Sequence, residues 1–167
     1  GNMIKSPVQY YLGLLQDFDL DVFPSPRRSL NMLRSMGQPF YNPPNVRGWV
    51  QGRHWINSAT LSARRQMVRN LMNPVPQKLL NADEERAIEA AVAAGHGKFT
   101  IPKELLNSFA AMSLDDLART LANRYHVQPN PESFREMLNQ FPAHRGNRKV
   151  TAAILATALT APAYQLC

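Results

Sequence analysis

Residues 37–65, GQPFYNPPNVRGWVQGRHWINSATLSARR, read as a long loop followed by a helix. Three prolines within the first eight residues prevent a continuous helix, because proline lacks a backbone N–H and restricts the residue before it. Two later glycines permit backbone conformations that other residues rarely adopt. Asn57 or Ser58 is then suited to cap a helix that we expect to continue to about Met72. The sequence therefore predicts an ordered loop over residues 37–57 that leads into a capped helix.

Helix signals recur through the rest of the chain. Ser6-Pro7 and Ser25-Pro26 each place a capping serine before a proline, which suits the first helical position. Further helices are expected at residues 83–94, 102–111, 113–125, 131–140 and 147–159. The last of these is apolar around most of its circumference, so we expect it to be central. With no convincing strand pattern or repeat, the predicted fold is all-α, an irregular bundle of about seven helices in a single domain over residues 1–167.

Charge is distributed unevenly along the chain. The formal net charge is +7, and no Asp or Glu occurs from Val22 to Ala82. That segment holds nine basic residues: Arg27, Arg28, Arg34, Arg47, Arg53, Arg64, Arg65, Arg69 and Lys78. Three interpretations stay open, namely a solvated basic surface, a surface complementary to an acidic partner or another part of the same parent chain, and a surface for nucleic acid or another polyanion.

The sequence predicts no catalytic residues. The four histidines are far apart in the chain, and no metal-binding motif such as HExxH or CxxC is present. Cys167 is the single cysteine, so an intrachain disulfide is excluded. Nucleophile-elbow and phosphate-loop motifs are also missing. We therefore expect no metal and no cofactor, and the lack of a run of about 18 apolar residues predicts no membrane span.

The loop and the helix after it supply the candidate binding residues. Aromatic rings could line a groove, basic side chains could donate hydrogen bonds, and a helix N-terminus favours anions. The candidates are Tyr41, Arg47, Trp49, Arg53, His54, Trp55, Asn57 and Arg64. The structural alternative is that the aromatic residues anchor the loop, Asn57 caps the helix and the arginines bond loop carbonyls. A protein-docking surface is the third interpretation, since long irregular loops are often functional.

Three segments together carry a resemblance to a known family. They are IKSPVQYYLGLL at residues 4–15, MGQPFYNPPNVRGWVQGRHWINSATLSARR at 36–65 and ALTAPAYQL at 158–166. The chain resembles the C-terminal part of the bacterial domain-of-unknown-function 1800 family. It departs from the family pattern at Val50-Gln51, where Pro-Gly is common, and at Arg47, where Lys is frequent. The resemblance implies a helical domain, with no agreed catalytic residues to transfer.

The resemblance also implies a biological setting. It suggests an exported bacterial protein, periplasmic or secreted, and it suggests two partners: the N-terminal half of the parent chain and a sulfatase-like or phosphatase-like protein encoded nearby. The opening residues GNMI lack an initiator methionine at position 1, so we expect a C-terminal fragment of a longer protein.

The expected function is a non-catalytic helical interaction module that docks an acidic surface through its basic loop and helix. The alternative is part of an enzyme, glycan-binding or anion-binding site centred on the Trp/Arg loop. Nucleic-acid binding ranks third, because the arginines are not ordered along one helix as in a groove reader.

Overall fold

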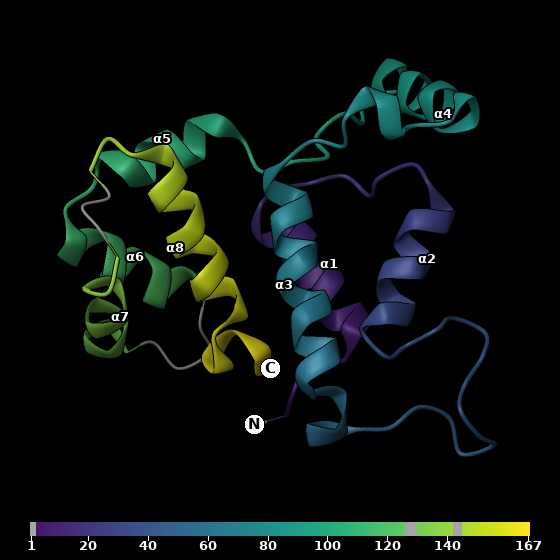
Figure 1. The fold of residues 1–167 in the computed structure, drawn as a ribbon, viewed down its shortest axis with the longest axis horizontal. Helices are drawn as coiled ribbons and strands as arrows, with labels where there is room; N and C mark the ends of the chain where they lie inside the picture. The colour runs from purple at the N-terminus through teal and green to yellow at the C-terminus, as the bar shows by residue number, and fades with distance from the viewer. Residues whose placement is uncertain (1–2, 126–129, 142–144) are drawn as a thin grey trace. The chain divides into compact units, whose positions relative to one another are not determined.

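The computed structural model describes residues 3–125, 130–141 and 145–167. Eight α-helices and no β-strand occur in these residues, which confirms the predicted all-α class. The chain forms two compact units, one over residues 4–101 and the other over residues 102–167 together with Met3 (Figure 1). The single domain expected from the sequence stays a prediction.

The first unit contains four α-helices and two short 3-10 helices. They are α1 (Pro7–Asp17), α2 (Pro26–Ser35), η1 (Gly52–Trp55), α3 (Ser58–Met72), η2 (Gln77–Leu79) and α4 (Ala82–Ala93). Helix α2 packs against both α1 and α3. Tyr10, Leu14, Leu33, Met36 and Val68 are almost completely buried in this unit. Burial of these side chains at helical spacing gives each helix its inner face.

The predicted caps are present. The Ser6 and Ser25 side chains accept hydrogen bonds from backbone N–H groups in the first turns of α1 and α2. At the start of α3, the Asn57 side chain accepts from the Thr60 N–H at 2.9 Å, and the Thr60 hydroxyl accepts from the Asn57 N–H at 2.9 Å. This reciprocal capping box satisfies donors that a helix start otherwise leaves without partners.

Gly37 ends α2 in a Schellman motif. Its φ is +95°, its N–H donates to the Arg34 carbonyl at 3.0 Å, and the Gln38 N–H donates to the Leu33 carbonyl at 2.9 Å. The Gln38 side chain then accepts from the Val8 N–H at 3.1 Å, in the first turn of α1. The end of α2 is thereby attached to the start of α1, and the chain leaves the helices for the loop.

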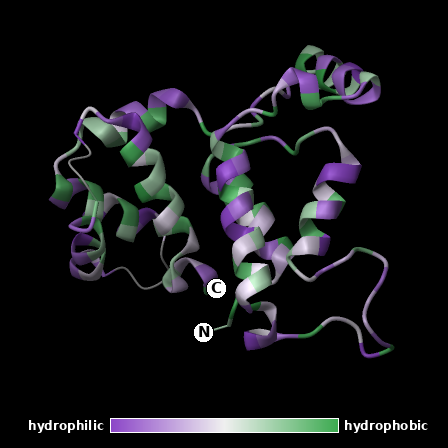
Figure 2. Cartoon of the chain, viewed as in Figure 1, coloured by the Kyte–Doolittle hydropathy of each residue, from purple (hydrophilic) through white to green (hydrophobic). Residues whose placement is uncertain are grey.

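The segment from residue 38 to residue 51 has no helix and runs out from the ends of α2 and α3 as a wide loop (Figure 1). It carries both hydrophobic and hydrophilic stretches along its length (Figure 2). Tyr41, at φ +60°, is one of two non-glycine residues with positive φ in the described chain. The predicted long loop is therefore present, and it returns to the helices through η1.

The second unit holds α5 (Lys103–Ala111), α6 (Leu114–Tyr125), α7 (Pro131–Leu138), α8 (Arg148–Thr160) and η3 (Pro162–Gln165). Helix α8 packs against α5, α6 and η3, and α6 packs against α7. Ile154, Leu155 and Leu159 of α8 are at most 1% exposed. The apolar circumference of α8 thus puts it at the centre of this unit. Its expected place at the centre of one bundle formed by the whole chain stays a prediction.

Candidate functional site

The three aromatic candidates lie in different environments. Tyr41 is 94% exposed, Trp49 is partly buried, and Trp55 is 6% exposed within η1. The buried Nε1 atom of Trp49 has no hydrogen-bond partner among the residues that the structure describes. Trp55 therefore anchors the end of the loop, whereas Tyr41 projects into solvent.

Three of the basic candidates are exposed. Arg47, Arg53 and His54 all lie on the loop or in η1, and their side chains form no ion pair within the described parts of the chain. Val46, beside Arg47, is fully exposed at 105%. The loop consequently presents cationic and apolar groups side by side.

Arg64 is buried, unlike the other basic candidates. It is 0% exposed, its guanidinium lies 4.7 Å from the centre of the Tyr10 ring, and it donates to the Lys5 carbonyl at 2.8 Å. Burial lowers the pKa of Arg64 to about 10, since a low-dielectric environment disfavours the charged form. This arginine holds the segment before α1 against α3.

Asn57 has a structural task at the start of α3, where its side chain and that of Thr60 form the capping box. Its amide oxygen is therefore already engaged with backbone N–H. The eight candidates thus comprise an exposed loop set, a partly buried and a buried tryptophan, a helix cap and a buried arginine.

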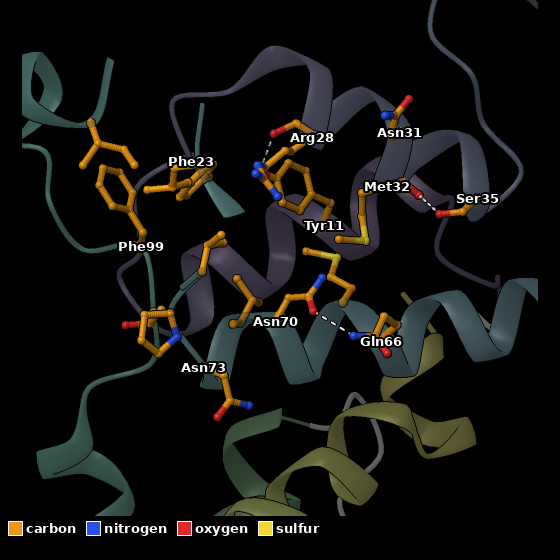
Figure 3. A pocket seen from close by; sticks show the side chains of 18 of the residues that line it. Tyr11, Phe23, Arg28, Asn31, Met32, Ser35, Gln66, Asn70, Asn73 and Phe99 are labelled. Carbon is orange, nitrogen blue, oxygen red and sulfur yellow. Dashed lines mark hydrogen bonds between the residues drawn. The ribbon is translucent and has the colours of Figure 1, made fainter. Parts of the chain in front are cut away.

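A pocket of about 690 Å³ lies elsewhere in the first unit, between α2 and α3 (Figure 3). None of the eight candidates lines it. Its lining comes from α1, α2, α3, α4, the segment between α1 and α2, and the segments before and after α4: Tyr11, Phe23, Arg28, Ser29, Asn31, Met32, Ser35, Gln66, Met67, Asn70, Leu71, Asn73, Pro74, Val75, Leu80, Ile88, Gly97, Phe99 and Thr100. Figure 3 shows Met32 of α2 and Asn70 of α3 projecting into the space between these helices.

An ion pair closes one side of this pocket. Arg28 Nε donates to one Glu84 oxygen at 2.7 Å, and the other oxygen accepts from an Arg28 Nη atom at 2.8 Å. Ser25 Oγ also donates to Glu84 at 2.7 Å. Hydrogen bonds from Arg28, first, and from Ser25 lower the pKa of Glu84 to about 2. The carboxylate is ionised at neutral pH, and its charge neutralises that of Arg28.

A second set of polar contacts fastens the chain after α4 to the chain after α1. The Asp21 carboxylate accepts from the Lys98 N–H at 2.9 Å and lies 3.1 Å from His96 Nδ1. The Lys98 ammonium pairs with Asp19. The Lys98 N–H, followed by His96, lowers the pKa of Asp21. Phe23 and Phe99 meet edge to face just beyond, with ring centroids 5.5 Å apart.

Two kinds of feature, a metal-binding cluster and a membrane-spanning helix, do not occur in the described residues. In the described residues, no group of three or more His, Cys, Asp or Glu side chains is placed to hold a metal ion. No helix formed by those residues is long and apolar enough to cross a bilayer. The loop is exposed, and the charge of Arg28 at the pocket is paired with Glu84.

Two features of the first unit are not marked by any sequence motif. Arg64 resembles its exposed neighbour Arg65 in sequence, and only its position on the inner face of α3 distinguishes it. The pocket combines residues from Tyr11 to Thr100, which no single pattern connects. One sequence feature could have indicated this side of the pocket. The spacing of Gln66, Asn70 and Asn73 places three amide side chains on one side of a helix and at its end.

A model of the family described as "Protein of unknown function (DUF1800)" matches residues 1–166. No curated protein and no solved structure matches the chain.

Proposed function

Since the chain belongs to the DUF1800 family of proteins of unknown function, we propose that it is a non-catalytic interaction module of an exported bacterial protein. It docks an acidic partner surface through the loop over residues 38–54. The observation that carries this proposal is the exposed tip of the loop. There Tyr41 and Val46 are 94% and 105% exposed and lie in the same loop as the exposed Arg47.

Charge supports an acidic partner. No Asp or Glu lies between Val22 and Ala82, so the loop carries no internal countercharge for Arg47 and Arg53. Opposite charge on a partner would steer association and fix its orientation. Exposed aromatic and arginine side chains are also the residue types most enriched among binding hot spots.

The backbone and Trp49 support the same proposal. Tyr41 adopts φ +60°, which costs roughly 1–2 kcal/mol for a residue with a side chain. The Trp49 Nε1 has no acceptor among the described residues, so it can donate a hydrogen bond to a partner. Strained backbone of the Tyr41 kind often occurs where a segment contacts a ligand or another surface.

We propose the N-terminal half of the parent chain as the partner. The sulfatase-like or phosphatase-like protein implied by the resemblance is the second partner to test. The partner surface needs an apolar hollow that accepts the Tyr41 ring and acidic residues that face Arg47 and Arg53.

Calorimetric titration of this chain with the N-terminal half tests the proposal. Arg47→Ala with Arg53→Ala, and separately Tyr41→Ala with Val46→Ala, should each weaken binding at least about tenfold. The matched control is Arg148→Ala with Lys149→Ala, which removes the same charge from exposed positions outside the acid-free segment. This control should bind like the unmodified chain.

Equal binding by the loop variants and the control would contradict the proposal for this partner. Binding of random duplex DNA at about 50 mM salt, with a steep salt dependence and no binding of the N-terminal half, would replace it with the nucleic-acid interpretation.

A further inference from the structure

We propose that the pocket between α2 and α3 binds a small uncharged molecule with an apolar body and a hydrogen-bonding end. This inference goes beyond the docking function, because it concerns different residues in the same unit. The volume of the pocket, about 690 Å³, lies within the range of roughly 300–1,000 Å³ typical of small-molecule sites.

The inner part of the pocket is apolar and adaptable. Met32 from α2 and Met67 from α3 line it, and Phe23 and Phe99 form an aromatic end with centroids 5.5 Å apart. Methionine side chains are unbranched and polarisable, so they adjust to different apolar shapes. This part favours an alkyl chain or a ring over a polar group.

Amide side chains form a polar edge. Asn31 of α2 and Gln66, Asn70 and Asn73 at α3 line the pocket and are exposed (Figure 3). The Gln66 amide nitrogen donates to the Asn70 amide oxygen at 2.8 Å. That bond leaves one acceptor on Gln66 and one amide donor group on Asn70 for a ligand. The two groups match a hydroxyl or a carbonyl on the ligand.

Electrostatics select against a charged ligand. Among the described residues that line the pocket, Arg28 is the one that carries a charge, and Glu84 already binds it with both carboxylate oxygens. A terminal nitrogen of Arg28 also donates a hydrogen bond to the Leu79 carbonyl at 2.6 Å. A ligand carboxylate or ammonium would lose hydration on entry without gaining a free countercharge, which is unfavourable.

Fluorescence titration of the 167-residue chain with Nile red, an uncharged dye, tests the inference. We expect saturable binding that decanol displaces at lower concentration than decanoate or decylammonium. Met32→Trp and Asn70→Trp, which fill the pocket from opposite helices, should each weaken dye binding at least about tenfold.

Matched controls place the same side chain on the same two helices outside the pocket. Leu30→Trp on α2 and Ser62→Trp on α3 alter exposed residues that do not line it, so both should bind the dye normally. Arg47→Ala with Arg53→Ala should also leave dye binding unchanged, which separates this inference from the docking proposal.

Three results would overturn the inference: no saturable binding, equal displacement by the three decyl compounds, or normal binding by the folded pocket variants. Circular dichroism establishes that each variant is folded. If Met32→Trp does not fold, Asn70→Trp decides the outcome, because Asn70 is exposed and its substitution should disturb the core less.

Discussion

Arg28 and Glu84, 56 residues apart in the chain, join through two hydrogen bonds of 2.7 and 2.8 Å. Glu84 also belongs to the capping box of α4, where its carboxylate accepts from the Asn81 N–H at 3.2 Å. One carboxylate therefore connects the first turn of α2 with the first turn of α4. Because Glu84 is buried, loss of its charge would leave Arg28 without its countercharge.

Glu84→Gln should lower the melting temperature. The amide keeps the size of the side chain but removes the charge and one acceptor, so we expect a decrease of about 5 °C. Thermal unfolding followed by circular dichroism measures it. Asp83→Asn is the control, since its ion pair with Arg86 is 2.6 Å long but exposed and should contribute little. Equal effects of the two substitutions would show that burial of Glu84 does not matter.

The stabilisation by Glu84 should depend on pH. Its pKa is lowered in the folded chain from 4.5 to about 2, mainly by Arg28. A lowered folded pKa stabilises the fold above the unfolded value and loses this effect as pH falls toward the folded value. The melting-temperature difference between the unmodified chain and Glu84→Gln should therefore be constant near neutral pH and shrink between about 4.5 and about 2. A difference that does not change across this range would contradict the assignment.

Arg64→Ala should destabilise the chain more than Arg64→Met. Alanine removes the packing over Tyr10 and the donor to the Lys5 carbonyl, for an expected loss of about 3 kcal/mol. Methionine restores much of the packing volume but not the donor, so the loss should be about half as large. Urea denaturation gives both values. Equal losses would mean that packing by the Arg64 stem contributes nothing.

Two glycine-to-alanine substitutions should have opposite effects. Gly37 has φ +95°, so Gly37→Ala should cost about 1–2 kcal/mol. Gly13 lies inside α1, where an added methyl group would meet no neighbouring atom within 4 Å. Gly13→Ala should therefore raise the free energy of unfolding by about 0.5–1 kcal/mol. Urea denaturation of both variants measures the two signs. Destabilisation by both would point to steric limits rather than backbone conformation.

Tyr41→Asn should stabilise the isolated chain by up to about 1 kcal/mol, because asparagine tolerates a positive φ better than tyrosine. Tyr41 is 94% exposed, so little buried area is lost. The same substitution should weaken docking to the N-terminal half. Denaturation and calorimetric titration report the two effects separately. The Tyr41 and Phe40 rings are tilted, with centroids 6.0 Å apart, and we expect this contact to contribute little to stability. A loss of stability in Tyr41→Asn would instead show that the Tyr41 ring supports the loop.

Local signals in the sequence predicted much of the fold. Ser6 and Ser25 cap the helices they were expected to cap, and Asn57 is the one of the two expected residues, Asn57 or Ser58, that caps α3. Such signals are readable because a cap and its partners lie within three residues of each other. Helix ends agree within a few residues. Helix α4, expected from residue 83, begins at Ala82 with Asn81 as its cap.

The candidate site was less predictable. The sequence marked the loop through its composition, and the structure shows that Tyr41 and Arg47 are exposed there while Arg64 is buried. Arg64 and Arg65 have the same chemistry and adjacent positions. Arg64 and Arg65 differ in burial because only one side of α3 faces the neighbouring helix. Several faces of this helix are weakly apolar, so the helical spacing of its sequence did not show which side is buried.

Helices, caps and the irregular loop are encoded locally, because they depend on backbone preferences and on side chains a few residues apart. Tertiary packing is what brings Glu84 to Arg28, lays Arg64 over Tyr10 and leaves a neutral pocket between α2 and α3. These relationships join residues far apart in the chain. They depend on how helices pack, which local propensity does not encode.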